Sequence, residues 1–124
     1  MSQAYVINLR KVLALAVIAE VGTGIALLVA PSQVSIWLLG TASIGVADQF
    51  ARLFGIALLA FGAACWPPVP GSEQKRAMLF YNAAAALYLI YIGLVVGGGL
   101  LLWPAVAFHI VMTGLLAYAW HTRR

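Results

Sequence analysis

VLALAVIAEVGTGIALLVA, from Val12 to Ala30, is a long apolar run in which Glu20 is the single charged residue. At a rise of about 1.5 Å per residue, a helix of this length crosses most of the hydrocarbon core of a bilayer. A carboxylate near the middle of such a helix is costly even on lenient insertion scales. Glu20 therefore requires a partner, a proton or a water-filled cavity.

The composition of the whole chain is that of a polytopic membrane protein. Of its 124 residues, 65% are hydrophobic and 8% are charged, and the mean hydropathy is +1.02. A soluble domain carries about 25% charged residues, so lipid has to be the solvent for most of this surface. The net charge of +4 does not indicate a nucleic-acid partner, because the basic residues come as pairs between apolar stretches. The one cysteine, Cys65, excludes an intramolecular disulfide, and the sequence has no metal-ligand pattern.

Four apolar stretches predict an all-α chain with four transmembrane helices in a single domain, residues 1–124. The spans are expected at about residues 12–30, 48–66, 77–96 and 100–120. Proline at position 31 and the run PPVPG at 67–71 end the first two spans, because proline cannot continue a helix. Three glycines at 97–99 form a tight turn between the last two. Short connections between four spans favour an up-down bundle.

Two further local structures are expected around the second span. QVSIWLL, residues 33–39, is too short to cross a membrane and contains Trp37, so it predicts an interfacial helix that ends at Gly40. Asp48 is expected as the N-cap of the second span, because its carboxylate can accept from the free N–H groups of the first turn.

The basic residues predict the orientation in the membrane. The pairs at 10–11, 75–76 and 123–124 all fall on one side of the predicted spans. The exception is Arg52, which lies inside the second span. Lysine and arginine are concentrated in cytoplasmic loops, so both termini are expected in the cytoplasm.

Five polar residues inside the spans are candidates for a ligand-binding site or a proton relay, and we expect them to form an interior cluster. They are Glu20, Arg52, Asn82, Tyr88 and His109. Counted along their helices, Glu20, Tyr88 and His109 lie at similar depth. Small residues accompany each candidate at helical spacing, which lets helices approach closely in lipid. The neighbouring Tyr81 is assigned to packing.

Each candidate also has a structural interpretation. Glu20 is then a neutral or paired carboxylate, and Arg52 reaches the outer interface and pairs with Asp48 one turn away. Asn82 and His109 are then hydrogen-bonding residues between helices, and Tyr88 is a packing residue. A buried pair of Glu20 and His109 could hold one shared proton. That chemistry suits proton coupling, a quinone-like head group, acid–base work on a lipid-soluble substrate, or a structural hydrogen bond.

Two resemblances add expectations. AEVGT, residues 19–23, is similar to the first-span signature of the small multidrug resistance exporters, which implies that Glu20 binds protons and a cationic drug in turn. Ala30-Pro31, then LLG at 38–40, then ARLFGIALLAFGAACW at 51–66 resemble the DoxX-like small four-span proteins of bacteria. That resemblance implies a place in the bacterial inner membrane and a quinone-linked or other redox role.

The sequence thus leaves three functions open. The first is a DoxX-like protein that binds a quinone-like or other lipophilic molecule, or serves as an accessory subunit of a membrane redox system. The second is a proton-coupled exporter that uses Glu20, and the third is a purely structural membrane subunit. The expected partners are the lipid bilayer, a lipophilic small molecule, and further copies of the chain or a larger membrane complex. No particular cofactor or reaction is indicated.

Overall fold

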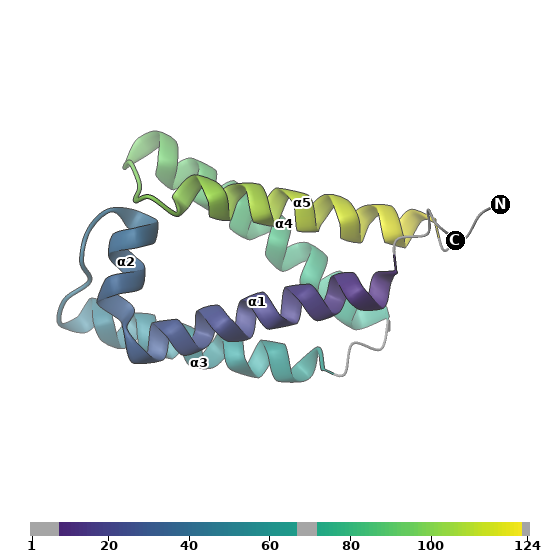
Figure 1. Ribbon diagram of the computed structural model, residues 1–124, viewed down its shortest axis with the longest axis horizontal. Coiled ribbons are helices and arrows are strands. Elements are labelled where there is room, and N and C mark those ends of the chain that lie inside the picture. The colour runs from purple at the N-terminus through teal and green to yellow at the C-terminus, as the bar shows by residue number, and fades with distance from the viewer. Residues whose placement is uncertain (1–7, 67–71, 123–124) are drawn as a thin grey trace.

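The computed structural model describes residues 8–66 and 72–122, and the regular structure of these residues is entirely helical (Figure 1). The helices are α1 (Leu9–Val29), α2 (Pro31–Leu39), α3 (Val46–Ala64), α4 (Ser72–Val95) and α5 (Leu102–His121). All but α2 are long and apolar enough to cross a membrane. The prediction of an all-α chain with four such helices is confirmed. The proline-rich stop at 67–71 and the basic pair at 123–124 lie outside the described residues.

The helix ends follow local rules of capping. The Asn8 side chain accepts a hydrogen bond from the backbone N–H of Arg10 at 3.1 Å, so α1 begins earlier than expected. Helix α2 begins at Pro31 itself, because the first helical position requires no N–H donor and suits the fixed φ of proline. It ends at Gly40, whose φ of 82° lies in the left-handed region that glycine adopts without strain.

The prediction that Asp48 caps the second span is wrong. Helix α3 begins at Val46, and Gly45 is the cap residue. Asp48 lies in the first turn, and its carboxylate accepts a hydrogen bond from the Ser43 hydroxyl in the preceding loop. A carboxylate in the first turn interacts favourably with the free N–H groups of the helix. Asp48 therefore still stabilises the N-terminus of α3, although it is a residue of the helix and not its cap.

The four long helices alternate in direction along the chain and form two antiparallel pairs, α1 with α3 and α4 with α5 (Figure 1). Packing is extensive within each pair and much sparser between the pairs. The up-down order agrees with the expectation, but the bundle is divided in two.

The α1–α3 interface depends on glycine. A Cβ atom added to Gly24 would lie 2.8 Å from the Gly55 carbonyl oxygen, and one added to Gly55 would lie 2.6 Å from the Gly24 carbonyl oxygen. A Cβ on Gly62 would lie 2.5 Å from the Val21 side chain. The backbones of the two helices thus touch directly, as the predicted stripes of small residues require.

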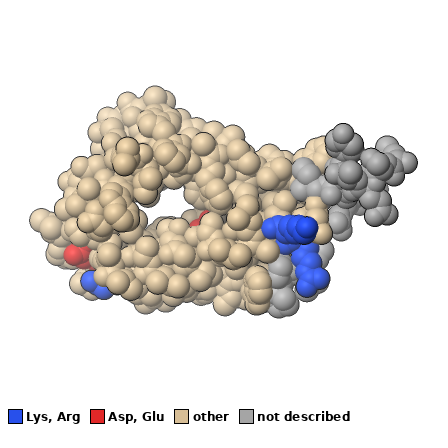
Figure 2. Space-filling model, in the orientation of Figure 1, with Lys and Arg blue, Asp and Glu red and all other residues tan. Residues whose placement is uncertain are grey.

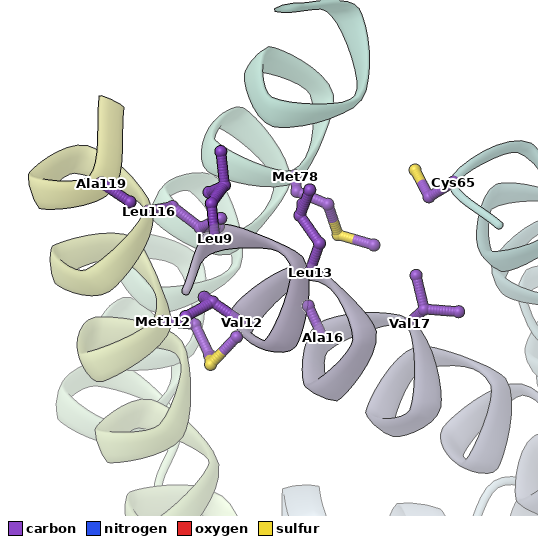
Figure 3. Close-up of a cluster of buried hydrophobic side chains, with 10 residues drawn as sticks. All are labelled: Leu9, Val12, Leu13, Ala16, Val17, Cys65, Met78, Met112, Leu116 and Ala119. Atoms are coloured by element: carbon purple, nitrogen blue, oxygen red, sulfur yellow. The ribbon is translucent and has the colours of Figure 1, made fainter. Parts of the chain in front are cut away.

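A shared apolar core joins the two pairs at the end of the molecule where α1 and α4 begin (Figure 3). Its members come from α1, α4, α5 and the residue after α3, and all are less than 9% exposed: Leu9, Val12, Leu13, Ala16, Val17, Cys65, Met78, Met112, Leu116 and Ala119. Burial of these side chains is the main attachment of one pair to the other.

At the opposite end, α2 connects the two pairs. The N–H of Gly99 donates to the Leu38 carbonyl at 3.2 Å, and the N–H of Leu101 donates to the Trp37 carbonyl at 2.7 Å. These bonds tie the end of α2 to the loop between α4 and α5. Between this connection and the shared core, the space-filling view shows an opening bordered by α1, α2 and α5 (Figure 2).

Candidate functional site

Glu20 lies in the middle of α1 and is only 3% exposed. The Tyr81 side chain of α4 lies close enough to Glu20 for its hydroxyl to interact with the carboxyl group. Ala16 and Gly24, one turn to either side of Glu20, are buried as well, so the carboxylate lies on the inward face of α1. The partner that Glu20 requires is therefore a phenol from the other helix pair.

Asn82 and His109 form a second polar contact, between α4 and α5. The Asn82 side chain is fully buried, and its amide nitrogen donates to the Met78 carbonyl at 2.9 Å. Its amide oxygen lies 2.8 Å from Nδ1 of His109. Since an amide oxygen only accepts, this arrangement assigns the imidazole proton to Nδ1 and leaves Nε2 with a lone pair. His109 can therefore accept one further hydrogen bond.

Tyr81 and its ring contacts connect these two polar pairs. The ring centroids of Tyr81 and His109 are 6.0 Å apart in an edge-to-face arrangement. The ring centroids of Phe61 and Tyr81 are 5.4 Å apart, and those of Phe108 and His109 are 5.5 Å apart. We call Glu20, Tyr81, Asn82 and His109 the polar cluster. It takes residues from α1, α4 and α5, and so from both helix pairs.

The opening seen in Figure 2 is bordered by α1 and α5, the helices that carry Glu20 and His109. Acidic atoms are visible at its edge, on the side of the shared core. Asp48 and Glu73 lie in the first turns of α3 and α4, whereas Glu20 lies halfway along α1, which borders the opening. A molecule that entered the opening from the side would thus approach hydrogen-bonding groups through an apolar surrounding.

The prediction that Tyr88 joins Glu20 and His109 in a buried cluster is wrong. Its side chain is 64% exposed, and its ring stacks on Tyr91 with centroids 6.1 Å apart. Tyr88 follows Tyr81 by seven residues, so the two share a helix face. Helix α4 diverges from α1 toward its C-terminus (Figure 1), which buries Tyr81 against Glu20 and leaves Tyr88 uncovered.

Arg52 is also separate from the polar cluster. Its guanidinium donates to the Leu28 carbonyl near the end of α1. Leu28 follows Glu20 by eight residues, about 12 Å along the helix. The expected pairing with Asp48 is replaced by this bond and by the bond from Ser43 to Asp48. Arg52 thus satisfies a free carbonyl of the last turn of α1 and attaches α3 to it.

Tyr81 is the cluster member that the sequence argument missed. The sequence favours packing for Tyr81, as it does for Tyr88. The available signal for Tyr81 is its position directly beside Asn82, itself a candidate. Of the five predicted candidates, the structure brings Glu20, Asn82 and His109 together through Tyr81.

The donor set of the cluster does not resemble a metal centre. Within residues 8–66 and 72–122, no three His, Cys, Asp or Glu side chains come together as a structural or catalytic metal would require. No protein-family model, curated protein or solved structure matches the chain.

Proposed function

We propose that the chain is a four-span protein of the bacterial inner membrane with both termini in the cytoplasm. The support is the length and apolar character of α1, α3, α4 and α5. Arg10, Lys11, Lys75 and Arg76 gather at one end of the molecule, whereas Arg52 at the other end is bonded to a backbone carbonyl (Figure 2). This asymmetry favours placing the first end in the cytoplasm.

We further propose that the polar cluster binds the head group of a quinone-like lipophilic molecule that enters through the opening from the lipid. The observation that carries this proposal is that Glu20, Tyr81, Asn82 and His109 join the two helix pairs, and that α1 and α5, which carry Glu20 and His109, border a lateral opening. Ligand sites commonly combine apolar walls with a few convergent polar groups. The DoxX-like resemblance of the sequence, which implies a quinone-linked role, points in the same direction.

The hydrogen-bonding capacity of the cluster suits a neutral head group. Nε2 of His109 accepts, the Glu20 carboxyl and the Tyr81 hydroxyl can each donate or accept, and Asn82 orients the imidazole. A quinone presents two carbonyl acceptors, and its reduced form presents two hydroxyl donors. None of the four residues is a permanent cation, so a head group of this kind adds no unpaired charge to a buried site.

The test uses purified protein in detergent micelles and ubiquinone-1, a short-chain quinone that quenches tryptophan fluorescence. Trp37 lies on α2, which borders the opening, and reports on occupancy. We expect saturable quenching whose dissociation constant rises about tenfold in Y81F and in E20Q, which corresponds to loss of about 1.4 kcal/mol. Y118F removes the same hydroxyl from an exposed tyrosine of α5 and should leave the constant unchanged.

Each of three other results would overturn the proposal that the polar cluster binds a quinone. Saturable binding of tetraphenylphosphonium that depends on Glu20, without quinone binding, would favour the proton-coupled exporter. Absence of saturable binding by both probes would favour a structural subunit. Equal binding by Y81F, E20Q and Y118F would show that the quinone occupies another place.

A further inference from the structure

A groove between α4 and α5 lies at the end of the molecule where α4 begins and α5 ends. It is lined by Leu79 from α4 and by Ala117, Trp120 and His121 from α5. Lys75 lies one turn before Leu79 on α4, and its ammonium is 5.8 Å from the centre of the Trp120 ring. The groove therefore has apolar walls along the helices, an imidazole among its lining residues and a cation over the ring of Trp120.

Lys75 shares the first turn of α4 with the acidic residue Glu73. The free N–H groups of this turn carry partial positive charge, which favours the Glu73 carboxylate and disfavours the Lys75 ammonium. Contact with the face of an aromatic ring offsets part of that cost. Arg10, Lys11 and Arg76 are exposed at the same end and raise the local positive potential (Figure 2).

The walls of the groove indicate what kind of anion fits. Leu79 and Ala117 continue from the charged mouth along helices that are long and apolar enough to span a membrane. Trp120 is half-buried at the end of α5, and tryptophan prefers the level of the lipid head groups. A soluble phosphate would use the mouth alone, whereas a phospholipid would use both the mouth and the walls.

We propose that this groove is a specific site for an anionic phospholipid of the inner leaflet. The phosphate accepts hydrogen bonds from the Lys75 ammonium and from the His121 imidazole, and the start of an acyl chain lies along Leu79 and Ala117. Basic pockets between spanning helices on the cytoplasmic side bind acidic head groups in this way. The site is independent of the polar cluster, which lies on the far side of the shared core.

The test measures which lipids the intact protein retains. Protein in mixed micelles with equal amounts of phosphatidylglycerol and phosphatidylcholine is analysed by native mass spectrometry. We expect the wild type to retain phosphatidylglycerol preferentially and K75Q to lower that preference about fivefold, the equivalent of about 1 kcal/mol. R76Q removes the same charge from an exposed neighbour and should change the preference by less than about twofold.

A second variant keeps the test decisive. W120L leaves the charge intact but removes the ring that orients Lys75, and it should lower the preference together with K75Q. Equal losses in K75Q and R76Q would show a diffuse basic surface, and equal retention of both lipids by the wild type would show no site. Each of these results overturns the proposal. Circular dichroism of each variant at 25 °C confirms that the helices are intact before its lipids are compared.

Discussion

The α1–α3 interface can be tested by the same substitution at two positions of one helix. Gly24 and Gly22 are two residues apart in α1. A Cβ on Gly24 meets the Gly55 carbonyl oxygen at 2.8 Å and the Leu58 Cβ atom at 3.2 Å, whereas a Cβ on Gly22 meets nothing within 4 Å. G24A therefore forces α1 and α3 apart, and G22A does not.

The expected magnitude follows from a subtraction. Replacing glycine by alanine within a helix is favourable by about 0.5–1 kcal/mol through backbone entropy, and this gain is common to both variants. Overpacking costs about 1–3 kcal/mol, and at Gly24 the obstacle is a backbone carbonyl, which cannot change rotamer. We expect the unfolding free energy of G24A to lie about 1–3 kcal/mol below that of G22A.

The measurement is reversible unfolding in mixed micelles with an increasing fraction of sodium dodecyl sulfate, followed by circular dichroism. Both variants are compared with the wild type at the same total detergent concentration, so the micelle environment cancels. If G24A is as stable as G22A, the two backbones do not approach as closely as the structure shows. If G22A is the less stable variant, its side of α1 is in contact with something else.

Three further outcomes test other parts of the structure. G99A should loosen the connection between α2 and the α4–α5 loop, because its Cβ would collide with the Trp37 backbone, and the Trp37 fluorescence should then shift in wavelength while total helicity is unchanged. H109A should lower the unfolding free energy by about 1–3 kcal/mol, because it leaves the buried Asn82 amide oxygen without a donor; a loss below about 0.5 kcal/mol would contradict that bond. The proposed orientation can be tested with reporter fusions. A fluorescent-protein fusion at the C-terminus should be bright and an alkaline phosphatase fusion there should be inactive, whereas phosphatase inserted after Gly40 should be active. The reverse pattern would refute the proposed orientation.

Much of the fold could be predicted from the sequence because its signals are local. Long apolar runs, prolines at their ends and Gly40 at the end of α2 act within a few residues of themselves. Helix existence was therefore predictable, and so were the buried small residues Gly24 and Gly55. The cap of α3 was predicted wrongly, because the choice between Gly45 and Asp48 depends on a loop whose path the sequence does not display.

The polar cluster was only partly predictable, because helix axes are set by contacts between distant segments. Counting residues assumes upright, parallel helices, and on that assumption Glu20 is level with Tyr88. In the structure, α4 contacts α1 near the shared core and then diverges from it (Figure 1). The partner of Glu20 is consequently Tyr81, about 10 Å nearer the start of α4.

The sequence by itself determined that four helices form and that Glu20, Asn82 and His109 need partners, since apolar length and the cost of burying polar groups are properties of the chain. The tertiary structure alone decided which partners they find. Close packing of Gly24 against Gly55, the shared core at one end and the α2 connection at the other hold the two helix pairs at an angle. That angle brings Tyr81 to Glu20, exposes Tyr88 and leaves an opening beside the polar cluster, because tilted helices can meet along only part of their length.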